Sequence, residues 1–323
     1  MAQHRMTRMT TLCLVALFLH APVAEPWGLR GHRMQIAATM NVLPADMPAF
    51  FRTAGPQLRF LSTEPDRWRT PESPAVVETS GPNHFFSYER APKVLPRNRH
   101  LFLVELIEAG MLDADRPSLA PFGLAPYAIQ EWADMLSGAF RRWRGMGEDT
   151  VERRTEKRQL EQSILFIAGA LAHWVTDMSQ PMHCSVHLLG WHPSVPNPHG
   201  YATDRSIHGR YETDYVDRVI DGRDVEAALT QRPVELGDWL EESSRYIAAC
   251  NGHVETIYRW DSEAPFGSGR ERAEAKPFTA ERLAEGAAML RDVWVTAWRR
   301  SAKSPYQLNH EAVPGRPRIQ DAR

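Results

Sequence analysis

Apolar residues recur along most of this chain at the three- and four-residue spacing of amphipathic helices. The first such pattern runs from Arg33 to Leu43. Further patterns predict helices over residues 97–111, 126–144, 150–182, 206–220, 236–259 and 279–300. Proline and glycine interrupt residues 44–82, and strand-like alternation is scarce. The pattern therefore predicts an all-α fold, organised as a single multi-helix domain.

The two ends of the chain differ from this pattern. Arg5 and Arg8 precede an apolar run from Leu12 to Leu19, and small residues and prolines follow up to Ala24. This order is typical of a secretory signal peptide over residues 1–24, cleaved between positions 24 and 26, and it indicates a secreted or periplasmic protein. The domain is expected to cover residues 27–303. The polar, proline-containing residues 304–323 are expected to form a flexible tail.

Composition narrows the function only slightly. A formal charge of -2 and a pI near 6.7 give no global electrostatic reason to expect a nucleic-acid-binding protein. The mixed charges of residues 152–158 are typical of a solvated helix face, and the spacing of Trp294 and Trp298 is typical of core packing. Export permits a disulfide between Cys184 and Cys250, and two free buried thiols fit equally well.

Histidines and carboxylates at helical spacing are the main chemical signal. His173 and Asp177 stand four residues apart on an apolar helical segment, and His183 shares a broad face with them if Pro181 bends the helix. His208 and Glu212 repeat the four-residue spacing. Burial of these groups without a cation would desolvate several polar groups and a charge. Imidazole nitrogens and carboxylate oxygens are ligands of zinc, so the segment predicts a metal site.

These residues resemble the central pattern of the zinc-dependent phospholipase C family and its relatives, the zinc-dependent single-strand-specific nucleases. The pattern is a histidine, an aspartate four residues on, Gln-Pro-Met/Leu-His, and a histidine with a carboxylate four residues later. The matching residues are His173, Asp177, Gln180-Pro181-Met182-His183, His208 and Glu212. Upstream, the family's tryptophan, histidine, early-loop aspartate and histidine before an aromatic correspond to Trp27, His32, Asp66 and His84.

The resemblance implies an all-helical fold with three zinc ions. It implies that the ions are held by three sets of ligands: Asp66, His84, His173 and Asp177; His183, His208 and Glu212; and His32, Asp177 and the amino group and carbonyl of Trp27. Asp177 would bridge two ions, and Asp66 is also the candidate general base. The amino group of Trp27 could serve only if proteolysis exposes it, because signal peptidase cuts poorly after Pro26.

The expected activity is phosphodiester hydrolysis. Glu212 ends its motif as in the phospholipases, which favours a phospholipid headgroup as substrate, whereas the short spacing from Trp27 to His32 is that of the nucleases. The alternatives are therefore an extracellular single-strand nuclease or 3′-nucleotidase, and a non-catalytic zinc-binding module. We expect transient contact with a membrane surface and no obligate protein partner. Three further histidines are expected at the surface: His187, His192 and His199. Trp191 is either a substrate contact or a loop anchor.

Overall fold

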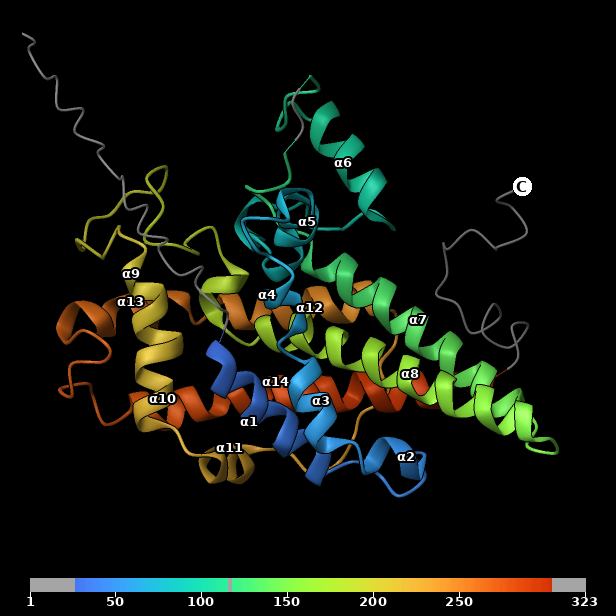
Figure 1. The fold of residues 1–323 in the computed structure, drawn as a ribbon. Coiled ribbons are helices and arrows are strands. Elements are labelled where there is room, and N and C mark those ends of the chain that lie inside the picture. Colours follow the sequence, from blue (N-terminus) through green and yellow to red (C-terminus); the bar gives the residue numbers. More distant parts are fainter. Residues whose placement is uncertain (1–26, 116–117, 304–323) are drawn as a thin grey trace, which may run out of the picture.

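Two long antiparallel helices, α7 (Ala125–Gly145) and α8 (Val151–Asp177), run through the centre of the molecule (Figure 1). The computed structural model describes residues 27–115 and 118–303, and within these ranges the fold is helical and contains no β-strand. The predicted all-α class is confirmed. The predicted signal peptide and the tail from residue 304 lie outside the described residues.

The other elements surround this pair. Helix α8 packs against α7, α14 and α3, while α1 lies along α14. Helices α5 and α6 project above the bundle in Figure 1. The remaining helices are α1 (Gly28–Asn41), α2 (Ala49–Arg52), α3 (Gly55–Leu61), α4 (Glu64–Arg67), α5 (Pro74–Ser80), α6 (Arg99–Glu108), α9 (Ser206–Gly209), α10 (Val216–Val219), α11 (Gly222–Ala228), α12 (Trp239–Asn251), α13 (Val254–Glu263) and α14 (Ala275–Arg300).

Helix α8 changes character along its length. The hydroxyl of Thr150 accepts a hydrogen bond from the Arg153 amide and caps the first turn. Residues 152–158 lie mostly exposed, as predicted for a solvated face. From Ala168 to its end the helix is buried on all sides, because α3, α7 and α14 cover it. Its last two turns therefore carry polar side chains into the interior.

The end of α8 differs from the prediction of a helix bent at Pro181. The helix stops at Asp177, and Pro181 begins a separate 3₁₀ turn, Pro181–Cys184. Proline has no amide hydrogen to donate to the Asp177 carbonyl, which accepts from the Gln180 amide instead. His183 consequently reaches the interior from a turn that folds back over the helix end.

The segment from Pro44 to Pro82 was predicted as interrupted chain, and this prediction was wrong. It contains α2, α3, α4 and α5. Pro56, Pro65 and Pro74 stand in the first turns of α3, α4 and α5, where a missing amide hydrogen costs nothing. The prolines here start short helices, and α4 places Asp66 in the interior.

The helix predicted over residues 236–259 is two helices. Helix α12 ends at Asn251, and α13 begins at Val254. The Asn251 amide group donates hydrogen bonds to the Cys184 carbonyl and to Glu89, which ties the break to the turn after α8. A tertiary contact therefore decides this boundary.

The interior is built largely from aromatic and aliphatic side chains. Trp294 is fully buried and Trp298 nearly so, as predicted for core packing. Cys184 and Cys250 are free buried thiols, as in the second of the two alternatives. None of the helices in residues 27–115 and 118–303 is long and apolar enough to cross a membrane.

The close approach of α3 to α8 depends on Gly169. A Cβ at this position would lie 2.3 Å from the Cβ of Leu61. We expect Gly169→Ala to push the helices apart and lower the free energy of unfolding by about 1–3 kcal/mol, measured by urea denaturation. The matched control is Gly138→Ala in α7, where nothing lies within 4 Å. It should be neutral or stabilise by up to about 1 kcal/mol. Equal effects of the two variants would contradict the packing argument.

Candidate metal centre

Eight of the predicted side chains converge at the end of α8. There α8 meets α1, α4, a turn that comes before α7 in the chain and a turn that comes after α8. Each of the eight side chains is at most 8% exposed. They come from α1 (His32), α4 (Asp66), the 3₁₀ turn Gly81–His84 (His84), α8 (His173 and Asp177), the turn Pro181–Cys184 (His183) and the helical segment 206–219 (His208 and Glu212). Residues spread over 180 positions of sequence thus form one buried polar cluster.

His84, His173 and Asp177 form the first group of potential ligand atoms, and Asp66 lies beside it. His173 Nε2 lies 3.0 Å from His84 Nδ1, and both nitrogens lie 3.3–3.4 Å from Asp177 Oδ2. Asp66 Oδ1 lies 3.5–3.6 Å from the same two nitrogens. Zinc bonds of about 2.0–2.2 Å place tetrahedral ligand atoms about 3.3–3.6 Å apart. The separations of His84, His173 and Asp177 are close to those of zinc ligands, and Asp66 is near enough to both histidines to contribute a further oxygen.

A second group forms around the helical segment 206–219. His183 Nε2 and His208 Nε2 lie 3.1 Å apart, and Glu212 Oε2 lies 2.8 Å from the latter and 3.7 Å from the former. Glu212 belongs to a π-helical turn, Arg210–Tyr215, of a kind often found at functional sites. Three donors at these separations leave a fourth tetrahedral position for water or substrate oxygen.

Hydrogen bonds at the outer edge of the cluster orient four of the imidazoles. The Nδ1 hydrogens of His173, His183 and His208 are donated to the carbonyls of Ser62, His84 and Leu188. His32 Nδ1 donates to the Thr176 hydroxyl, which itself donates to the Ala172 carbonyl. In a neutral imidazole the other nitrogen, Nε2, then carries the lone pair, and in all four it faces the carboxylates. Metal-binding histidines are commonly held in this way.

Asp177 faces both sides of the cluster. Its Oδ1 lies 3.3 Å from His32 Nε2, while its Oδ2 faces His84 and His173. This is the orientation of a bridging carboxylate. His32 also forms a possible three-donor group with Asp66 and His173, so its ligand atom is close to two sets of donors.

Trp27 is the first described residue and lies beside the cluster. Its indole donates to Ser179 Oγ at 2.8 Å, and its carbonyl accepts from the Gly31 amide at 3.0 Å. The residue is fully buried with φ of 51°, in the left-handed region. The proposed role of its amino group remains a prediction, because the residues before it lie outside the described part of the chain.

Burial and mutual charge determine protonation here. Burial raises the pKa of Asp177 well above its ordinary value. Burial also raises the pKa of Asp66, but His173, His84 and Arg69 outweigh it and hold that pKa well below the usual range. Burial lowers the pKa of His173, yet Asp177 and Asp66 bring it up to about 9. The centre thus requires positive charge, which either protons or metal cations can supply.

Several buried polar atoms receive no hydrogen bond from residues 27–115 and 118–303. In the cluster these atoms are Asp177 Oδ1, Asp177 Oδ2, Asp66 Oδ2, Glu212 Oε1 and His84 Nε2. Each such atom costs about 1–3 kcal/mol when it is buried without a partner. Bound cations would satisfy the oxygens, and the mixed nitrogen and oxygen donors suit zinc. The residues present fit divalent metal ions in up to three groups.

Two residues support the donors: Arg69 was not singled out from the sequence, and Gln180 was named only as part of the motif. Arg69 donates to Asp66 Oδ1, and Gln180 donates to Glu212 Oε2 at 3.2 Å while accepting from the Met182 amide. The three-residue spacing of Asp66 and Arg69 could have indicated the first pair, with Arg69 just beyond the end of α4.

The histidines between the motifs were predicted at the surface, and His187 contradicts this. It is 5% exposed, and its ring stacks on that of Trp191 with 3.8 Å between the ring centroids. Its Nδ1 accepts the amide hydrogen of His192. His192 is partly exposed, and His199 is exposed. The Trp191 indole donates to the Pro196 carbonyl, so it anchors the loop.

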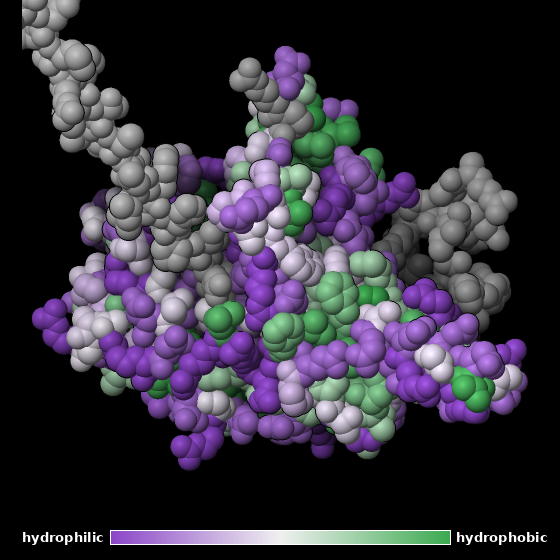
Figure 2. All heavy atoms as spheres, in the orientation of Figure 1, coloured by the Kyte–Doolittle hydropathy of each residue, from purple (hydrophilic) through white to green (hydrophobic). Residues whose placement is uncertain are grey.

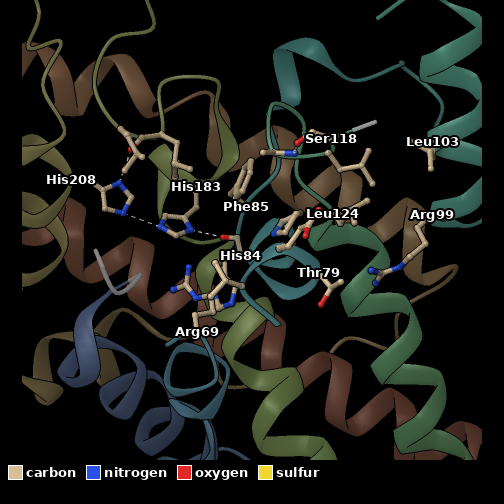
Figure 3. Close-up of a pocket in the computed structure, with 18 of the residues that line it drawn as sticks. Arg69, Thr79, His84, Phe85, Arg99, Leu103, Ser118, Leu124, His183 and His208 are labelled. Carbon is tan, nitrogen blue, oxygen red and sulfur yellow. Dashed lines mark hydrogen bonds between the residues drawn. The ribbon is translucent and has the colours of Figure 1, made fainter. Parts of the chain in front are cut away.

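A cavity of about 590 Å³ opens onto the cluster. His84, His183 and His208 form part of its wall, with Arg69 below His84 and Arg99 across the opening (Figure 3). Apolar residues complete the wall: Val77, Pro82, Phe85, Leu103, Leu119, Leu124, Leu188 and Leu189. The chain is thus an all-α protein with a buried histidine and carboxylate centre that a ligand can reach.

No protein-family model matches the chain, and no curated protein matches it. Among solved structures, the chain is similar to the alpha toxin from Clostridium absonum, with a TM-score of 0.38 and 11% sequence identity. The match covers 88% of this chain and 66% of that chain. A likeness of this size carries no argument about activity.

Removal of metal should destabilise the protein, because it leaves the buried carboxylates without a counter-ion. A metal present at 100 times its Kd stabilises by about 2.7 kcal/mol, so we expect a chelator to lower Tm by about 5 °C or more. Zinc should restore the Tm and magnesium should not, because magnesium prefers oxygen ligands. An unchanged Tm for protein purified with zinc would contradict a metal centre.

Substitution of a donor in one group should remove the metal ion of that group and leave the other ions bound. His208→Gln removes one donor of the group formed with His183 and Glu212, and we expect the zinc content measured by mass spectrometry to fall by about one ion per chain. His199→Gln, at an exposed position, is the matched control and should retain all zinc. Equal zinc contents in the two variants would argue against a site at His208.

Proposed function

We propose that this protein is a secreted or periplasmic zinc-dependent hydrolase of phosphoric ester bonds, of the phospholipase C type. The observation that carries the proposal is the access of the cavity to His84, His183 and His208, which makes the donor cluster reachable by a substrate. The family resemblance of the motif residues supports the reaction class. Three zinc ions would be held by Asp66, His84, His173 and Asp177; by His183, His208 and Glu212; and by His32, Asp177 and Trp27.

The bound ions would acidify a water molecule and neutralise charge on the phosphate oxygens. Asp66 is suited to accept the proton of that water. Arg69 occupies its Oδ1, while Oδ2 is buried and accepts no hydrogen bond from the described residues. The low pKa of Asp66 keeps it ionised at neutral pH, which favours acceptance of a hydrogen bond from the water over strong basicity. Its carboxylate would therefore orient the water as well as ligate.

Apolar surface around the opening favours a lipid substrate. Val77 and Leu189 line the cavity and are 40% and 43% exposed. Hydrophobic side chains also lie on the projecting α6 (Figure 2), where Leu101 and Val104 are exposed beside the cavity residues Arg99 and Leu103. Such a rim would contact acyl chains or a membrane surface transiently.

A nuclease or 3′-nucleotidase is the second candidate. Phe85 in the cavity wall offers an aromatic face for a base, and the short spacing from Trp27 to His32 fits that branch of the family. The non-catalytic alternative fits less well, because a structural zinc site is closed by four protein ligands and needs no cavity.

Asp66→Asn tests the catalytic proposal. We expect hydrolysis of phospholipid vesicles to fall by about 10²–10⁴-fold, because the amide cannot take a proton, while most zinc is retained. Released phosphorylated headgroup and zinc content are the two measurements. Asp46→Asn, at an exposed position, is the matched control and should behave as the parent protein.

Assays with different substrates distinguish the phospholipase from the nuclease. Release of headgroup from vesicles supports the phospholipase, whereas turnover confined to single-stranded DNA or 3′-nucleotides selects the nuclease. A zinc-loaded protein that hydrolyses none of these would overturn the proposed activity.

A further inference from the structure

The charged side chains of the cavity wall are mostly basic. Outside the metal cluster, the described lining contains Arg69, Arg99 and Arg205, and Glu78 is its one acidic residue. A concave wall of one sign concentrates ligands of the opposite charge. The three arginines differ, however, in how far their charge is already compensated.

Arg99 is fixed in the wall. Its guanidinium donates to both oxygens of Glu131 at 2.6–2.7 Å and to Asn83 at 3.3 Å. Most of its charge is therefore compensated by protein groups. Arg99 shapes the cavity and contributes little to selection of a charged ligand.

Arg69 has donor capacity left next to the metal centre. Its side chain is 13% exposed, and one nitrogen binds Asp66. Its Nε is buried and donates to no group in the described ranges. The guanidinium has five N–H groups, so those that line the cavity are available to a phosphate oxygen.

Arg205 is the uncompensated charge at the opening. It is exposed, and no carboxylate of the described residues pairs with it. Its neighbour Asp204 is engaged by the amide and hydroxyl of Ser206. Arg205 lies three residues before His208, so a ligand on the second metal group would pass beside it.

The loop that carries Arg205 is held in place by a close backbone contact. The Trp191 amide donates to the Ala202 carbonyl at 2.8 Å. Gly190, with φ of 106°, lies so near Thr203 that a Cβ would come within 2.4 Å of its carbonyl oxygen. This contact holds Thr203, two residues before Arg205, against Gly190, two residues after Leu188, whose carbonyl orients His208.

A quaternary ammonium group finds a poor site in this cavity. Such groups are bound by several aromatic faces, often with acids, and Phe85 is the one aromatic residue of the described lining. An ammonium near Arg69 and Arg205 would also be repelled, which discriminates against it.

We propose that the cavity selects phospholipids whose headgroup is free of an ammonium group, such as phosphatidylglycerol, over phosphatidylcholine, and that Arg205 is a specificity residue. This inference rests on the proposed phospholipase activity. Arg69 would hold a phosphate oxygen, and Arg205 would favour the net negative lipid at the opening.

Competition within one vesicle tests the selection. Vesicles of equal parts phosphatidylglycerol and phosphatidylcholine present both headgroups on the same surface, so general attraction to an anionic membrane cancels. The zinc-loaded full chain should release phosphoglycerol about tenfold faster than phosphocholine, a ratio that reports relative kcat/KM.

Arg205→Glu should lower this ratio about tenfold, because it places a negative charge where the anionic lipid enters. Arg232→Glu is the matched control, since Arg232 is exposed, has no ion pair among the described residues and does not line the cavity. It should leave the ratio unchanged. Circular dichroism and zinc content establish that both variants fold.

Glu78→Gln tests the opposite hypothesis, in which the cavity prefers phosphatidylcholine. If Glu78 binds the choline ammonium, this variant should lose phosphocholine release selectively, and the inference is overturned. Equal or choline-preferring release by the parent protein, or an unchanged ratio in Arg205→Glu, would overturn it as well. Release of neither headgroup would instead reject the phospholipase activity.

Discussion

The buried carboxylate of Asp177 at the end of α8 is the constraint on which the rest of the structure depends. Both of its oxygens lie in the interior and accept no hydrogen bond from the part of the chain that is described. Imidazole nitrogens from α1, α8 and the Gly81–His84 turn surround it at 3.3–3.4 Å. Without a cation this arrangement is held only by protons on groups such as His173. The helices therefore enclose a place where charge must be neutralised.

The backbone around the cluster is arranged for the imidazoles. The carbonyls that orient His173, His183 and His208 belong to the end of α3, the turn before Phe85 and the loop after His187. None of these segments is a long helix. They are short elements that the long helices α7, α8 and α14 hold in position. The long helices therefore supply a rigid frame, and the short segments between helices place the carbonyls that orient the imidazoles.

The candidate metal donors and most of the charged cavity wall lie on different elements. The candidate metal donors are buried, and three of them, His84, His183 and His208, also reach the cavity, whose remaining wall includes residues of α5, α6 and the loop that carries Arg205. Substitution of Arg205 can alter the charge that a ligand meets, because Arg205 contacts none of the donors through a hydrogen bond or ion pair in the described residues. The proposed discrimination between headgroups is a property of that wall.

The sequence by itself determined the helical class, because the three- and four-residue spacing of apolar residues is a local property. It also indicated the buried donors, since His173 and Asp177, or His208 and Glu212, are brought together by one turn of helix. Only the tertiary structure decided that α12 ends at Asn251 and that His187 is buried. It also brought Arg69 and Arg205 to the same cavity. These outcomes depend on contacts between distant segments, such as Asn251 with Cys184 and Gly190 with Thr203, which no local pattern contains.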